Sequence, residues 1–111
     1  MIEKTIYDHL KASGLAVYME IPQGGGTPPF VVVERTGGGE ENHIKRCTVA
    51  IQSYGATLYK AAELNETVKQ AMEGLIQKMS VASCRLNSDY NFTDTTKKLY
   101  RYQAVFDIVH Y

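Results

Sequence analysis

The residues of this chain that could do chemistry are few, and their spacing matches no metal-binding pattern. There are three histidines and two cysteines, with no CxxC pair and no HxxxH pair. His43 and Cys47 are the closest potential ligands, and a spacing of four places both side chains on one face of a strand. Cys47 shares that face with Val49 and Ile51, which is typical of a small buried side chain, while His43 lies at the start of the strand. We therefore predict no metal site.

A nucleophile with a positioned base is not indicated either. The chain has no GxSxG motif, which would place a serine on a strained turn. Asp107 and His110 fall on opposite faces of a predicted C-terminal strand, and Asp89 and Asp94 lie in a predicted polar loop. We expect no catalytic residues and no cofactor, and hence a protein that is not an enzyme.

Two runs of three glycines, at 24–26 and 37–39, come closest to a ligand-binding motif. A phosphate-binding P-loop needs Gly-x-x-x-x-Gly-Lys-Ser/Thr at the start of a helix, so that backbone N–H groups face the phosphates. Both runs lead instead into predicted strands, and Glu40 and Glu41 follow the second run where a lysine is required. Two carboxylates would repel a phosphate. We interpret the second run, with Asn42, as a flexible tip between two strands.

Composition describes one ordinary globular domain over residues 1–111. Apolar residues make up 44% and charged residues 22%, and 12 basic residues balance 12 acidic ones. The sequence therefore has no basic field of the kind that binds nucleic acid. No apolar run approaches the roughly 20 residues of a membrane span, and the N-terminus lacks the pattern of a signal peptide. We expect an intracellular protein with reduced thiols.

Hydrophobic periodicity predicts seven elements in the order α-β-β-β-α-β-β. Ile2, Ile6 and Leu10 predict a helix over 2–13, and apolar residues at three- and four-residue spacing predict a second over 57–78. The predicted strands come in consecutive antiparallel sets, with only two helices to cover them. We therefore predict an α+β fold, with a mainly antiparallel sheet of four to five strands and both helices packed on one face. The predicted strands are 15–21, 30–36, 43–54, 80–86 and 99–111, with a polar loop over 87–98.

The aromatic residues are unusual in kind: eight tyrosines accompany three phenylalanines and no tryptophan. Tyrosine has an apolar ring and a polar tip, and it is enriched at protein interfaces. Tyrosines on half-exposed sheet faces would account for the composition equally well. Alternation in the last strand places Tyr100 and Tyr102 on one face with Ala104, Phe106 and Ile108.

Three segments, in this order, resemble small neck proteins of long-tailed bacteriophages of Gram-positive hosts. The segments read VVVERTGG (31–38), IQSYGATLYKAAEL (51–64) and LNSDYNFTDTTKKLYRYQAVFDI (86–108). The proteins they resemble are the tail terminator or tail-completion (tail-to-head joining) proteins, and the resemblance spans nearly the whole chain. It rests on the order of the segments and on no catalytic motif.

The resemblance implies an α+β fold, no enzymatic activity, and a hexameric ring that caps the tail tube and docks it to the head connector. The partners would be further copies of the chain, the tail tube protein and the connector or stopper proteins, with the subunit in the host cytoplasm during assembly and then in the virion. DNA would pass through the ring without specific binding, which suits a net charge of zero. The candidate residues for subunit contacts or for the lumen are Gly37, Gly38, Gly39, Glu40, Glu41, Asn42, Tyr100 and Tyr102.

Two other function classes remain open on sequence grounds. A small-ligand or regulatory α+β module would need a closed apolar pocket with converging polar groups. An RNA-binding sheet would need exposed aromatic residues, for which Tyr100 and Tyr102 are the candidates, among basic residues such as Lys97, Lys98 and Arg101.

Overall fold

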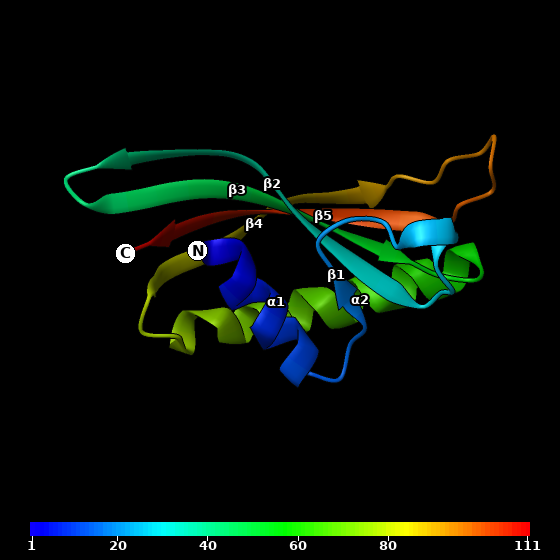
Figure 1. Cartoon of the computed structure of the whole chain (residues 1–111), viewed down its shortest axis with the longest axis horizontal. Coiled ribbons are helices and arrows are strands. Elements are labelled where there is room, and N and C mark those ends of the chain that lie inside the picture. The colour runs from blue at the N-terminus through cyan, green and yellow to red at the C-terminus, as the bar shows by residue number, and fades with distance from the viewer.

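The computed structural model describes all 111 residues and shows one five-stranded sheet with both α-helices against a single face (Figure 1). The α+β prediction and its element order are therefore confirmed. The elements are α1 (Ile2–Ala12), β1 (Val17–Tyr18), a 3-10 turn η1 (Gln23–Gly25), β2 (Phe30–Glu41), β3 (Ile44–Tyr54), α2 (Leu58–Glu73), a 3-10 turn η2 (Gly74–Gln77), β4 (Val81–Asn91) and β5 (Arg101–His110).

The sheet has the strand order β1-β2-β3-β5-β4. Neighbouring strands are antiparallel except for β1, which pairs parallel to β2 through Val17 and Tyr18 alone. The strand predicted over 15–21 is thus far shorter, and its pairing is parallel. Its connection to β2 must bring the chain back to the same end of the sheet, and Pro22 with the first glycine run occupies that crossover.

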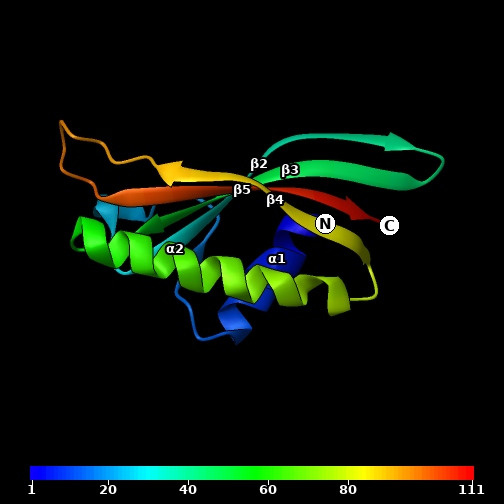
Figure 2. The same ribbon diagram turned by 180° about the vertical axis from the view of Figure 1, so that it is seen from behind.

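One hydrophobic core fills the space between the sheet and the helices. Ile6 and Leu10 of α1 are fully buried there, with Val68 of α2 and Val49 and Ile51 of β3. Figure 2 shows α2 running along the sheet and α1 crossing beside it on the same side. The other face of the sheet carries no helix; we call it the open face.

Local sequence determines where α2 begins and where it ends. The Thr57 hydroxyl accepts a hydrogen bond from the Lys60 backbone N–H at 3.1 Å, a side-chain N-cap. The helix was predicted to run to residue 78, but it ends at Glu73 and continues only as η2. Gly74 disfavours the helix, and His9 of α1 packs within 3.5 Å of the position where a Gly74 side chain would begin.

The second glycine run is part of a strand, which corrects the prediction of a flexible tip. Gly37, Gly38 and Gly39 pair with Thr48, Cys47 and Arg46 of β3. The turn is confined to Asn42 and His43, whose φ angles are 51° and 66°. Two consecutive residues with positive φ form a tight two-residue hairpin turn whose twist matches that of the flanking strands.

The chain after β3 also departs from its predicted boundaries. The strand predicted over 80–86 continues to Asn91, so the polar loop begins only at Phe92. Residues 87–91 look like a loop because they are polar, yet β4 is an edge strand that pairs only with β5. An edge strand needs backbone partners on one side only, and its side chains can remain solvated.

Candidate interaction surfaces

The end of the β2–β3 hairpin, residues Thr36–Arg46, extends beyond the helix layer, and we call it the arm (Figure 1). Every residue from Glu34 to Arg46 is exposed, whereas β2 up to Val33 and β3 from Cys47 are largely buried. On the β3 side the arm stays attached to the sheet, because Lys45 still pairs with His110 of β5. The outer edge of β2, on the side away from β3, has no partner strand along the arm.

The charges of the arm are mixed, and carboxylates do not dominate them. Glu40 lies opposite Lys45 on the neighbouring strand, and Glu41 opposite Ile44, with Arg46 one residue further along. None of these charged side chains forms an ion pair within the chain. The arm therefore presents two acidic and two basic groups, all free to pair with another molecule.

The glycines turn part of β2 into bare backbone. No atom lies within 4 Å of the position where a side chain would begin at Gly37 or Gly39. At Gly38 the nearest atom is the carbonyl oxygen of Arg46, 3.2 Å away. A strand without side chains allows another backbone to approach closely from the side.

The two candidate tyrosines do not lie together on the open face. Tyr102 pairs with the fully buried Ser53 on the helix-covered face, beside Tyr59 and Asn65 of α2. Tyr100 precedes β5, and its carbonyl oxygen accepts a hydrogen bond from the Gly55 N–H at 3.1 Å. These positions leave the RNA-binding alternative without the aromatic pair on which it was based.

An aromatic cluster that the sequence did not reveal occupies the open face, centred on Arg101. Its guanidinium lies 4.4 Å from the ring centroid of Phe92 and 5.7 Å from that of Tyr54. Arg101 also donates to the Tyr54 hydroxyl at 2.9 Å and to the Phe92 carbonyl oxygen at 2.7 Å. Phe30 stacks on Tyr54 with centroids 4.6 Å apart, and Tyr90 meets Phe92 edge to face.

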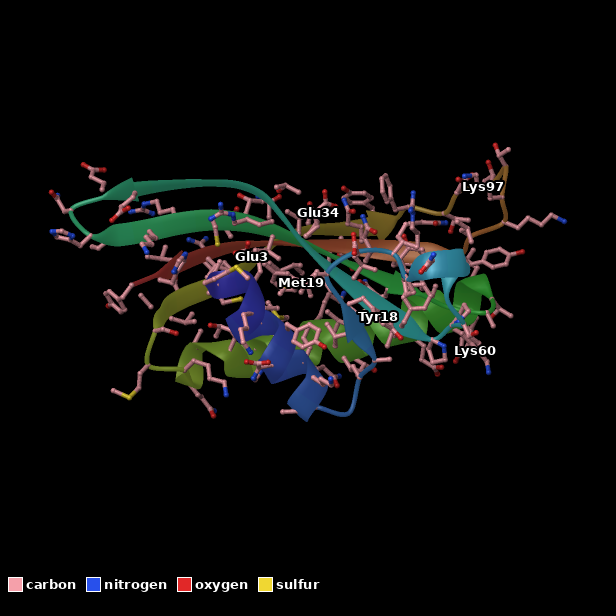
Figure 3. All side chains as sticks on the ribbon, in the orientation of Figure 1. Glu3, Tyr18, Met19, Glu34, Lys60 and Lys97 are labelled. Atoms are coloured by element: carbon pink, nitrogen blue, oxygen red, sulfur yellow. The ribbon has the colours of Figure 1, made fainter.

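Polar and apolar groups both surround this cluster. Gln52 donates to Gln103 at 3.0 Å and accepts from the Tyr54 hydroxyl at 3.1 Å, so the buried amide is satisfied. Met19 is partly exposed beside it, and Glu34 projects on the side away from the helices (Figure 3). Strand alternation alone places Gln52 and Tyr54 on one face, but only the tertiary fold brings Phe92 back over Arg101.

A polar contact ties α2 to the β4 edge. Buried Asn65 donates to an Asp89 carboxylate oxygen at 3.0 Å, and Lys69 approaches the same oxygen to 2.9 Å while also contacting Glu66. The hydrogen bonds that Lys69 donates to Glu66 and Asp89 raise the pKa of Lys69. Asn65 Oδ1 has no hydrogen-bond partner, so this side chain is only half satisfied.

Both cysteines are free thiols in the sheet, on the strands that flank β5. Cys47 and Cys84 pair with the two sides of Ile108, so β5 separates them. Burial raises the pKa of Cys47, and burial with the nearby Cys47 raises the pKa of Cys84 to about 11. A thiol with a raised pKa is a poor nucleophile at neutral pH. No three His, Cys, Asp or Glu side chains converge where they could hold a metal ion.

His9 has a structural contact that joins the two helices. Its Nε2 lies 2.7 Å from the Ala71 carbonyl oxygen, and since a carbonyl can only accept, Nε2 carries the proton.

No helix has the length and apolar character required to cross a membrane. Comparison with known proteins finds no matching family model and no matching curated protein.

Proposed function

We propose that this chain is a non-enzymatic structural subunit of phage virion assembly, a tail terminator or head-tail joining protein that acts as a ring at the neck. The observation that carries the proposal is the continuous exposure of Glu34–Arg46 on an ordered hairpin. An ordered, glycine-containing hairpin end without a core gains stability when another protein covers it. The resemblance of three chain segments to phage neck proteins supports the same role.

Two features of the fold suit a subunit that packs against its own copies. The arm and the aromatic cluster around Arg101 lie on different parts of the molecule, and each presents exposed apolar or charged groups. A ring requires a head-to-tail interface, in which two different surfaces of the subunit meet. The partners at the two ends of the ring would be the tail tube protein and the head connector.

The proposed passage of DNA is consistent with the balanced charge of the arm. A lumen lined by cations alone would retain the phosphate backbone, whereas Glu40 and Glu41 beside Lys45 and Arg46 leave no net positive charge. The subunit would reside in the host cytoplasm during assembly and in the virion afterwards.

Native mass spectrometry and negative-stain imaging of the purified protein, alone and mixed with tail tubes, test this function. We expect closed rings in at least one of the two samples, seated at the tube end in the mixture. A protein that remains monomeric in both contradicts the proposal. Genes for portal, capsid and major tail proteins next to the gene for this chain would support it independently.

A further inference from the structure

The sheet has two unpaired edges, and they lie on opposite sides of the molecule. β4 pairs only with β5, so its outer edge is free from Val81 to Asn91. β2 is covered by β1 only at Val31 and Val32, so its outer edge is free along the arm. Free edges present unpaired backbone N–H and C=O groups, which can accept a further strand.

We propose that these two edges meet in a second copy of this chain, so that the β4 edge of one copy pairs with the β2 edge of the next. The inference rests on the self-association contained in the proposed function. Because the three ladders from β2 through β3 and β5 to β4 are all antiparallel, β4 runs opposite to β2. Copies related by rotation about an axis along the strands therefore bring the two edges together in antiparallel sense, which continues the pattern inside the subunit.

The register of the proposed seam follows from the ladders. Gly38 pairs with Cys47, Cys47 with Ile108, and Ile108 with Cys84, so Gly38 and Cys84 lie at the same height on opposite edges. Rotation about that axis preserves height, so Cys84 of one copy comes opposite Gly38 of the next. Both positions belong to the helix-covered face of the sheet.

Bulges delimit the segments that can pair. On β4, Ser83–Leu86 lies between two register shifts, and regular pairing with β5 covers these four residues. On β2, a shift between Arg35 and Gly37 lies at the height of Leu86, at the end of that segment. Bulges usually protect an edge against association, and here they confine it to a short stretch at matching height.

The side chains at that height suit a close approach. Gly37 and Gly39 have open space where a side chain would be, so β4 of the next copy meets only backbone. Leu86, a residue of β4 that is 45% exposed, would lie beside the aliphatic part of Arg35 and lose contact with water. Arg85 forms no ion pair within its own chain and would lie beside Gly37.

Disulfide trapping can test the seam. Cys47 is first replaced by alanine, because its Cβ is 3.7 Å from the position of a Gly38 side chain and would compete for the bond. Gly38→Cys is then introduced, and the protein is oxidised in mildly alkaline buffer, since burial raises the pKa of Cys84 to about 11. Within one chain, β2 and β4 are separated by three strand spacings, roughly 14 Å, whereas a disulfide needs Cα atoms within about 7 Å. A bond between positions 38 and 84 must therefore join two chains.

Gly37→Cys and Gly39→Cys in the same background are the matched controls, because their side chains point to the opposite face. We expect the bond with Cys84 to form at least about tenfold faster from position 38 than from either control, because only position 38 presents its thiol to the correct face. A Cys84→Ser variant should abolish it. Native mass of the unoxidised protein is measured in parallel.

The two readouts separate this inference from the proposed function. Rings without a preferential 38–84 bond would overturn the edge pairing and leave the ring role standing. A protein that is monomeric alone and with tail tubes, and that forms no such bond, would contradict both. Bonds of equal rate from all three positions would indicate random collision and would also overturn the seam.

Discussion

Replacing Gly55 with alanine tests how the sheet and α2 fit together. Gly55 follows directly after β3, and a Cβ at this position would lie 2.3 Å from the Ala61 backbone nitrogen and 2.8 Å from its Cα. Both atoms belong to the first turn of α2, and Ala61 is completely buried. No rotamer change relieves a clash with backbone, so α2 must move away from the sheet.

The expected loss follows from two opposing contributions. Overpacking against a rigid neighbour costs about 3 kcal/mol, and the lower entropy of the unfolded alanine chain returns about 0.4–1 kcal/mol. The net loss in the free energy of unfolding is then about 2 kcal/mol or more. For a domain of this size, such a loss lowers Tm by about 8 °C, at roughly 4 °C per kcal/mol.

Urea unfolding followed by circular dichroism measures the loss in the free energy of unfolding, with Gly39→Ala as the matched control. The same methyl group at Gly39 meets no atom within 4 Å, and this strand residue has no positive φ angle. Its free energy of unfolding should stay equal or rise by up to about 1 kcal/mol. A Gly55→Ala protein as stable as wild type would refute the described contact, and a destabilised Gly39→Ala protein would refute the strand conformation of the glycine run.

Three further predictions concern charge and reactivity. Asn65→Asp places a second carboxylate next to Asp89 and should lower the free energy of unfolding by about 3 kcal/mol at neutral pH. Denaturation across a pH series should show that this stability is regained in acid, where one of the two carboxylates is protonated. A loss that does not depend on pH would contradict the reasoning. The folded-state pKa of Cys84 is raised to about 11 from 9.0, so the contribution of the neutral thiol to stability is complete below the unfolded pKa and is lost as pH rises through the folded pKa. Cys84→Ser should therefore flatten the dependence of the free energy of unfolding on pH in that alkaline range. An unchanged pH dependence would count against burial as the cause. In the proposed ring, Glu40→Lys with Glu41→Lys should leave assembly intact but impair DNA ejection, because added cations would retain the phosphate backbone. Unchanged infectivity would rule out a lumen role for these carboxylates.

Local patterns were sufficient where each residue's environment follows from its near neighbours in the chain. Ile2, Ile6 and Leu10 repeat at helical spacing and are all buried. Cys47, Val49 and Ile51 alternate and all face the core. The fold class follows from such patterns, because they give consecutive strands with only two amphipathic helices to cover them.

Patterns were misleading where backbone pairing outweighed side-chain preference. Three glycines followed by acidic residues look like a loop, yet they extend β2 because Arg46, Cys47 and Thr48 supply a partner ladder. The polar residues 87–91 belong to β4 for the same reason. Glycine carries no side chain to signal a face, and an edge strand does not need an apolar one.

The sequence by itself therefore determined the helices, the central strands, the α+β class and the lack of a recognisable catalytic or metal-binding motif. The tertiary structure alone decided the strand order, the two free edges, the strand character of Gly37–Gly39 and the meeting of Arg101 with Tyr54 and Phe92. Helical and strand periodicity reflect contacts along the chain, whereas sheet order and surface clusters depend on contacts between distant segments. Such contacts leave no periodic signal in a single sequence.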